Sequence, residues 1–79
     1  MTNQELFDKA FIDTFEISAD QLAGLKYQDI QAWDSVGHMS LMAALEDAFD
    51  IMMDTDDIID FSSYEKGKEI LSKNYDIEF

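Results

Sequence analysis

Helical spacing of apolar residues dominates this chain, and no proline interrupts it. At the N-terminus, Thr2 and Glu5 form a T-x-x-E capping box, and the apolar residues after it share one helical face as far as Phe15. Residues 16–33 lose this spacing, so they are expected to form a long ordered loop with room for one turn of helix. A connection of this length is uncommon unless it has a function.

A second helix is expected to begin at Ser35, because Asp34 is a good N-cap and apolar residues recur after it at helical spacing. The apolar arc of this helix is wide, so it should be the most buried of the helices. Its methionines Met39 and Met42 are expected to fill the core. Trp33, just ahead of the helix, is expected to pin the loop to the core.

Two further helices follow. The segment DTDDIIDF predicts a short helix that is capped by Asp54 or Thr55 and ends near Asp60. Ser62 and Glu65 make a second capping box before a terminal helix. The residues expected on the inward side of that helix are Tyr64, Gly67, Ile70, Leu71 and Tyr75. The sequence therefore predicts one all-α domain over residues 1–79, a four-helix bundle with three main helices, a short third helix and a long first loop.

Length and composition limit the classes of protein to which this chain can belong. A chain of 79 residues supports one small core, so a large enclosed active site is not expected. Hydrophobic residues make up 47% of the chain, enough apolar material to fold. There is no cysteine, which removes disulfides and thiolate metal ligands. The N-terminus lacks a signal-like pattern and no apolar run approaches about 18 residues, so we expect a cytoplasmic protein that does not enter a membrane.

The charge of the chain is strongly negative. Eighteen acids against five lysines give a formal net charge of −13, and no lysine or arginine lies between Lys26 and Lys66. A nucleic-acid backbone would be repelled, whereas a basic protein surface would be attracted. The alternative is an ordinary acidic surface that is exposed to solvent and binds no partner, which would account for the same composition.

Asp34, Ser35 and His38 supply the residue types of a hydrolytic triad. The aspartate, however, adjoins the serine and is not placed to orient the imidazole. The sequence also has no G-x-S-x-G elbow. We therefore expect no hydrolytic site here, and interpret His38 as a surface or packing residue.

The acidic segment DTDDIID has the density of carboxylates that a calcium loop requires. An EF-hand that started at Asp54 would need glycine at its sixth position, where the chain has Ile59. The apolar pair Ile58 and Ile59 indicates a helix instead. No specific metal site is expected.

Ser35 remains as an acceptor for modification. In the first turn of a helix its side chain should be accessible to an enzyme. A phosphate attached there would lie near free backbone N–H groups and the positive end of the helix dipole. An ordinary serine in the N-cap region is the alternative interpretation.

The segment WDSVGHMSLMAALEDAFDI, residues 33–51, resembles the modification segment of acyl carrier proteins, whose D-S-[LV] motif opens the second helix of a four-helix bundle. The resemblance extends over the whole chain, including the helix order, the long first loop and the short acidic third helix. It implies an acyl-carrier-like bundle that acts as a monomeric shuttle and is itself no enzyme.

The resemblance implies that Ser35 receives 4′-phosphopantetheine from coenzyme A, attached by a holo-carrier synthase, also called a phosphopantetheinyl transferase. The thiol of this arm would hold an acyl or aminoacyl group as a thioester, which agrees with a chain that has no cysteine. Asp34 matches the motif aspartate beside the attachment point, which helps the modifying enzyme to engage.

The resemblance also implies a recognition face for partner enzymes with basic docking surfaces. Its residues are Val36, Met39, Glu46 and Asp47 on the second helix, extended by Asp54, Asp56, Asp57 and Asp60. Such a face should speed association while leaving affinity modest and salt-sensitive. The core beneath the second helix could loosen around an acyl chain, although a small or polar cargo would not need this. That core is expected to include Phe7, Met39, Leu45 and Ile59.

Two positions depart from the carriers of primary fatty acid biosynthesis. Gly37 stands where those carriers usually have an acid, and Ser40 where they usually have a glutamate. The sequence therefore looks more like the free-standing carriers of specialised pathways, such as polysaccharide, polyketide or aminoacyl-transfer systems. The alternative function is an unmodified acidic helical adaptor that binds a basic partner protein.

Overall fold

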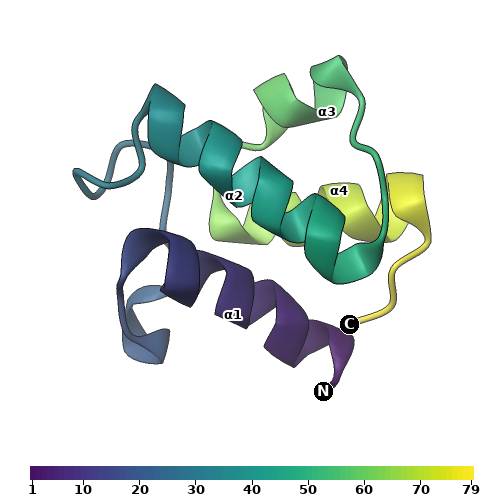
Figure 1. The fold of residues 1–79 in the computed structure, drawn as a ribbon, viewed down its shortest axis with the longest axis horizontal. Helices are drawn as coiled ribbons and strands as arrows, with labels where there is room; N and C mark the ends of the chain where they lie inside the picture. Colours follow the sequence, from purple (N-terminus) through teal and green to yellow (C-terminus); the bar gives the residue numbers. More distant parts are fainter.

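The computed structural model describes residues 1–79 and is all-helical, as predicted (Figure 1). It contains no strand, and the one isolated bridge joins Lys26 to Ser63. The molecule is a small helical bundle with extents of 29 × 27 × 20 Å. Its elements are α1 (Asn3–Phe15), the 3-10 turn η1 (Ala19–Gln21), α2 (Ser35–Phe49), α3 (Thr55–Asp60) and α4 (Tyr64–Tyr75).

Local capping starts α1 and α2 where the sequence predicts. The Thr2 side chain accepts from the Glu5 N–H, and the Glu5 carboxylate accepts from the Thr2 N–H, which completes the first capping box. The Asp34 carboxylate caps α2 by accepting from the Gly37 N–H at 2.8 Å. The two helices pack together and run in opposite directions (Figure 1).

The long loop between α1 and α2 is held by backbone pairing with the α3–α4 junction. The Tyr27 N–H donates to the Ser62 carbonyl at 2.9 Å, and the Tyr64 N–H donates to the Leu25 carbonyl at 2.8 Å. Leu22 and Leu25 are buried beneath this pairing. The expected ordered loop with a turn of helix is confirmed.

The capping box predicted at Ser62 and Glu65 is wrong by one residue. Ser63 is the N-cap of α4, and its hydroxyl accepts from the Lys66 N–H at 3.0 Å. The Ser62 carbonyl is already engaged by the loop, so the helix begins one residue later. The Glu65 carboxylate instead accepts from the Gly24 N–H at 3.1 Å, which ties α4 to the loop.

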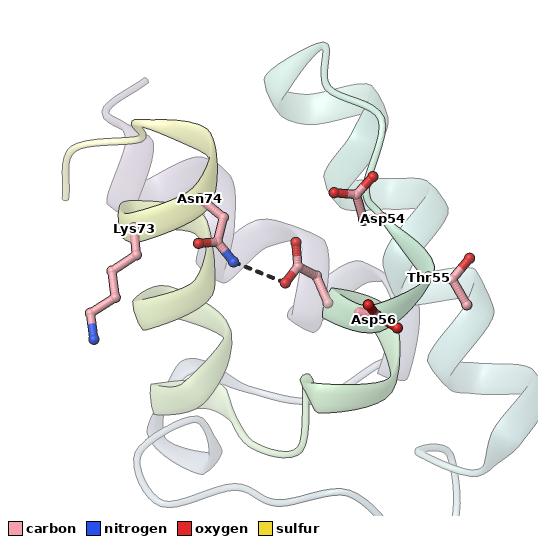
Figure 2. A pocket seen from close by; sticks show the side chains of 6 residues that line it. Asp54, Thr55, Asp56, Lys73 and Asn74 are labelled. Atoms are coloured by element: carbon pink, nitrogen blue, oxygen red, sulfur yellow. Dashed lines mark hydrogen bonds between the residues drawn. The ribbon is translucent and has the colours of Figure 1, made fainter.

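Polar contacts hold the short α3 against α4 (Figure 2). The Asp57 carboxylate accepts from the Asn74 amide at 2.9 Å and from the Tyr75 hydroxyl at 2.7 Å. The Tyr75 hydroxyl also accepts from the Asp54 N–H at 2.8 Å. No residue of α3 is fully buried, so these hydrogen bonds contribute much of its attachment.

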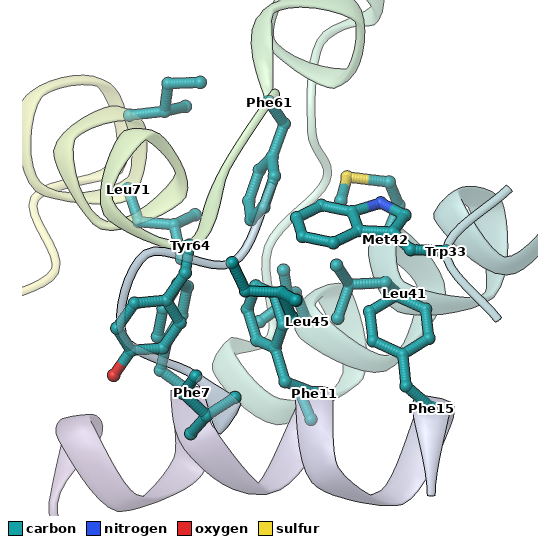
Figure 3. Packing of buried hydrophobic residues seen from close by; sticks show 14 of the residues in the cluster. Phe7, Phe11, Phe15, Trp33, Leu41, Met42, Leu45, Phe61, Tyr64 and Leu71 are labelled. Atoms are coloured by element: carbon teal, nitrogen blue, oxygen red, sulfur yellow. The ribbon is translucent and has the colours of Figure 1, made fainter. Parts of the chain in front are cut away.

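Aromatic rings fill the centre of the bundle (Figure 3). Trp33 is fully buried, as predicted, with its ring 5.5 Å from that of Phe11 and stacked at 5.3 Å on that of Phe15. Phe61 lies 6.2 Å from Phe11 on the other side, and Gly67 lets its ring approach the α4 backbone. The loop therefore contributes the largest core side chain.

Three expectations about burial are wrong. Met39 is 54% exposed and Ile59 is 72% exposed, although both were expected in the core. α2 is also not the most buried helix, because it buries three residues whereas the shorter α1 buries four. The helix α3 has only six residues and cannot place both Ile58 and Ile59 against the core, so Ile59 faces solvent.

Candidate functional site

Ser35 is the first residue of α2, and its side chain is exposed, as predicted. Its hydroxyl makes no hydrogen bond to the protein, while the neighbouring Asp34 carboxylate is engaged with the Gly37 N–H. The Asp34 carbonyl accepts the first helical bond from the His38 N–H at 2.8 Å. The N–H groups of Ser35 and Val36 have no partner within the helix. The Ser35 hydroxyl is thus exposed and unbonded, beside two backbone donors suited to an anion.

A groove of about 400 Å³ opens beside Ser35, between the start of α2, α3, the α3–α4 junction and Tyr27 of the long loop. Its lining is mostly apolar, and Ser35 is one of the lining residues. The lining residues are Tyr27, Ser35, His38, Met39, Ile58, Ile59, Phe61 and Ser62. A molecule attached to Ser35 would therefore meet an apolar surface at once.

His38 forms the seam between α2 and α3. The Trp33 indole N–H donates to His38 Nδ1 at 2.9 Å, so the ring proton lies on Nε2, which donates to the Ile58 carbonyl at 2.8 Å. Both ring nitrogens are engaged, and no lone pair remains for the Ser35 hydroxyl. The interpretation of His38 as a packing residue is confirmed.

Exposed apolar side chains surround the groove. Val36 is 74% exposed and Met39 projects one turn further along α2. Ile59 of α3 belongs to the same surface, and the sequence interpretation missed it as a surface residue. A signal was available, because the adjacent Ile58 and Ile59 of a six-residue helix cannot both face the core. Met39 and Ile59 line the groove, and Val36 follows Ser35 directly in the chain; we call these three exposed side chains the apolar rim.

The acids of the predicted recognition face fall into two groups. Those with exposed side chains are Asp47, Asp54, Asp56 and Asp60. Glu46 and Asp57 are half-buried: the Glu46 carboxylate accepts from the Met53 N–H at 2.9 Å, and Asp57 is bound to α4. The exposed group is free to meet a partner, whereas Glu46 and Asp57 also stabilise the fold.

Asp57 affects the pKa of Tyr75, its hydrogen-bond partner on α4. Burial, and then the hydrogen bond to Asp57, raises the pKa of Tyr75, while the Asp54 N–H lowers it.

The hollow between α3 and α4 is lined by Asp54, Asp56, Asp57, Lys73 and others (Figure 2). No three carboxylates or imidazoles anywhere converge as metal ligands do.

Gly37 has a clear steric role. A Cβ atom on this residue would lie 1.9 Å from the Ala32 carbonyl oxygen and 3.3 Å from the Phe15 ring. The end of the long loop thus lies in direct contact with the first turn of α2, and a larger side chain at residue 37 would not fit unless the loop shifted. Ser40, one turn further along α2, is exposed.

None of the helices combines the length and the apolar character required to span a membrane. The chain matches no protein-family model, no curated protein sequence and no solved structure.

Proposed function

We propose that this chain is an acyl carrier protein that carries acyl or aminoacyl groups on a 4′-phosphopantetheine arm attached to Ser35. The observation that carries the proposal is the exposed, unbonded Ser35 hydroxyl on the first residue of α2. The order of the helices, with a long first loop and a short third helix, supports the same assignment. The site of action would be the cytoplasm, and the acting species a monomer.

The residues at the start of α2 fit the arm. Its phosphodiester would lie beside the N–H groups of Ser35 and Val36 and the positive end of the helix dipole. The adjacent Asp34 carboxylate is directed by one of its oxygens to the Gly37 N–H. The neutral remainder of the arm would meet the apolar rim.

The attachment reaction balances with coenzyme A as the co-reactant. The Ser35 oxygen forms a bond to the phosphorus that carries pantetheine, and the bond from that phosphorus to the bridging oxygen breaks. The leaving group is 3′,5′-ADP, and the hydroxyl proton passes to a base of the transferase. Once attached, the arm supplies a thiol that holds the cargo as a thioester.

The surface around Ser35 supports brief docking to partner enzymes. The apolar rim offers a small contact area, and the exposed acids Asp47, Asp54, Asp56 and Asp60, on or next to α2 and α3, add negative charge to the surface of the same helices. Basic enzymes would be steered to this face, with a rate that falls as salt rises. Weak, fast docking suits a carrier that must leave one enzyme for the next.

The departures at Gly37 and Ser40 favour a specialised pathway over fatty acid biosynthesis. At Gly37 the loop contact excludes the usual acid, and at Ser40 the recognition charge is absent. Enzymes that bind fatty acid carriers through the acidic side chains at these two positions would bind this chain poorly.

The test is incubation with coenzyme A and a broad-specificity phosphopantetheinyl transferase, followed by intact mass measurement. We expect a gain of one phosphopantetheine group on the wild type and on Ser40→Ala, an exposed serine on the same helix. Ser35→Ala should gain nothing. If the wild type gains nothing while a known carrier is fully modified, the proposal fails and the acidic adaptor becomes the better assignment.

A further inference from the structure

The imidazole of His38 connects three parts of the chain. The Trp33 indole N–H donates to His38 Nδ1 at 2.9 Å, and His38 Nε2 donates to the Ile58 carbonyl at 2.8 Å. The rings of Tyr27 and Phe61 lie 5.5 and 6.0 Å from the imidazole, at steep angles to it. The two hydrogen bonds, which we call the His38 latch, therefore join the long loop to α3 through one side chain of α2.

The His38 latch requires a neutral imidazole. An indole N–H can only donate, so Nδ1 must keep its lone pair to accept from Trp33. A second proton on the ring would occupy Nδ1 and would set two donors against each other. Trp33 is fully buried and its indole makes no other hydrogen bond, so the loss of His38 leaves a buried donor without a partner. A protonated ring therefore does not fit the closed latch.

The imidazole, and not the indole, is the ring that can move. The Trp33 ring lies inside the core, stacked at 5.3 Å on Phe15 and 5.5 Å from Phe11. The His38 side chain is only half-buried, so it can turn towards solvent. When it turns, Nε2 leaves the Ile58 carbonyl, and α3 loses its hydrogen bond to α2.

The attachment of α3 to α4 does not depend on the latch. Asp57 accepts from the Asn74 amide at 2.9 Å and from the Tyr75 hydroxyl at 2.7 Å, and neither bond involves His38. No residue of α3 is fully buried, so little apolar packing replaces the lost bond to α2. Opening of the latch therefore separates α3 from the start of α2, beside Ser35, while α3 stays on α4.

No acidic side chain is bonded to the imidazole in a way that would hold a protonated ring in place. The Asp34 carboxylate accepts from the Gly37 N–H, and the Asp57 carboxylate is bound to α4. None of the titratable or charged side chains on the elements around His38 forms a hydrogen bond with its ring. Those side chains are Lys26, Tyr27 and Asp29 of the long loop, Asp34 at the N-cap of α2, and Asp56, Asp57 and Asp60 of α3. A charged ring thus gains no carboxylate in exchange for the indole.

We propose that the His38 latch is a pH-sensitive switch, which opens the seam between α2 and α3 when the imidazole gains a proton. Histidine side chains ordinarily change charge between pH 5 and 8. Because only the neutral ring makes both bonds, the stability that the latch contributes is present at pH 8 and is lost as the pH falls. The shape of the groove beside Ser35 then depends on pH. This inference does not require that Ser35 carries an arm.

An NMR titration of the unmodified chain from pH 8 to pH 5 tests the switch directly. The readouts are the His38 ring signals, the Trp33 indole N–H, the Ile59 backbone amide and the Asn74 side-chain amide. We expect the Trp33 and Ile59 signals to shift with the same midpoint as the His38 ring. The Asn74 amide should not shift with that midpoint, because its bond to Asp57 stays closed.

His38→Gln is the matched variant, because an amide side chain offers both an acceptor and a donor but does not titrate. Between pH 8 and pH 5, the Tm of the wild type should fall by about 4–8 °C relative to the Tm of this variant. That is the size expected for one lost hydrogen bond in a domain of this length. The comparison at each pH removes the effect of the carboxylates, which both proteins share. The NMR titration needs only the wild type, so the test does not depend on the folding of the variant.

Three outcomes overturn the inference. The first is a His38 ring that titrates while the Trp33 and Ile59 signals stay unchanged, which would mean that the seam accommodates the charged ring. The second is a His38 ring whose signals do not change between pH 8 and pH 5. The third is a constant Tm difference between the wild type and His38→Gln over that range. None of the three bears on the attachment of an arm to Ser35, which the mass measurement tests separately.

Discussion

Replacing Gly37 by alanine tests whether the loop and the first turn of α2 are in direct contact. The new Cβ would lie 1.9 Å from the Ala32 carbonyl oxygen. That neighbour is backbone and cannot rotate away, so the loop itself must shift. Because the same loop carries the buried Trp33 ring, a shift also disturbs the core.

The expected size of the effect follows from two opposing contributions. Alanine is favoured over glycine within a helix by about 1 kcal/mol. Inserting a methyl group into a closely packed contact costs about 1–3 kcal/mol, and the upper end applies where backbone must move. The net loss in the free energy of unfolding is about 2 kcal/mol. For a domain of this size, that corresponds to a Tm lowered by about 8–16 °C.

The Tm of the Gly37→Ala protein is measured by thermal unfolding, which is followed by circular dichroism and by Trp33 fluorescence. Ser40→Ala is the matched control, because Ser40 is an exposed residue of the same helix and its change should leave the Tm within a few degrees. A Gly37→Ala protein as stable as the wild type, or more stable, would mean that helix propensity outweighs the contact. The steric account of this glycine would then be wrong.

Four further predictions follow from particular contacts. In Gly67→Ala the Cβ would lie 2.1 Å from the Phe61 ring, so we expect a loss of about 2 kcal/mol in urea unfolding, partly restored by adding Phe61→Leu. Asp34→Ala removes the cap on the Gly37 N–H and should cost about 1 kcal/mol, measured in the same way. Burial, and then the hydrogen bond to Asp8, raises the pKa of Tyr64 to about 12. Since the folded state holds this proton more tightly, stability should fall as pH rises from about 10 to 12, by about 1–2 kcal/mol after allowance for solvent near the hydroxyl. Tyr64→Phe should remove that part of the fall, and an identical alkaline profile would contradict the assignment. Finally, the excess of acids predicts a Tm that rises as magnesium chloride is titrated, and a flat or falling Tm would exclude self-repulsion as a source of instability.

The sequence predicted the helices well, because caps and apolar spacing act over only a few residues. Thr2 with Glu5, and Asp34 before Ser35, start α1 and α2 at the expected positions. The error at the start of α4 shows the limit of such signals. Ser62 has the residue type of a cap, but the pairing of its carbonyl with a distant loop moves the cap to Ser63.

The candidate site was predictable in part for the same reason. The exposure of Ser35 follows from its place in the first turn of a helix, and the structure agrees. The roles of Glu46 and Asp57 were not predictable, since their partners Met53 and Tyr75 come from other parts of the chain. Composition shows that acids are plentiful without showing which of them the fold engages.

The sequence by itself determined the order of the helices and the placing of a free serine hydroxyl at the start of α2. Only the tertiary structure decided which apolar residues are covered, putting Trp33 inside and leaving Met39 and Ile59 in solvent. The physical reason is that helical spacing defines an apolar face, whereas burial depends on the neighbour that covers it. The helix α3 has only six residues, and an apolar groove remains open between it and the start of α2, beside Ser35.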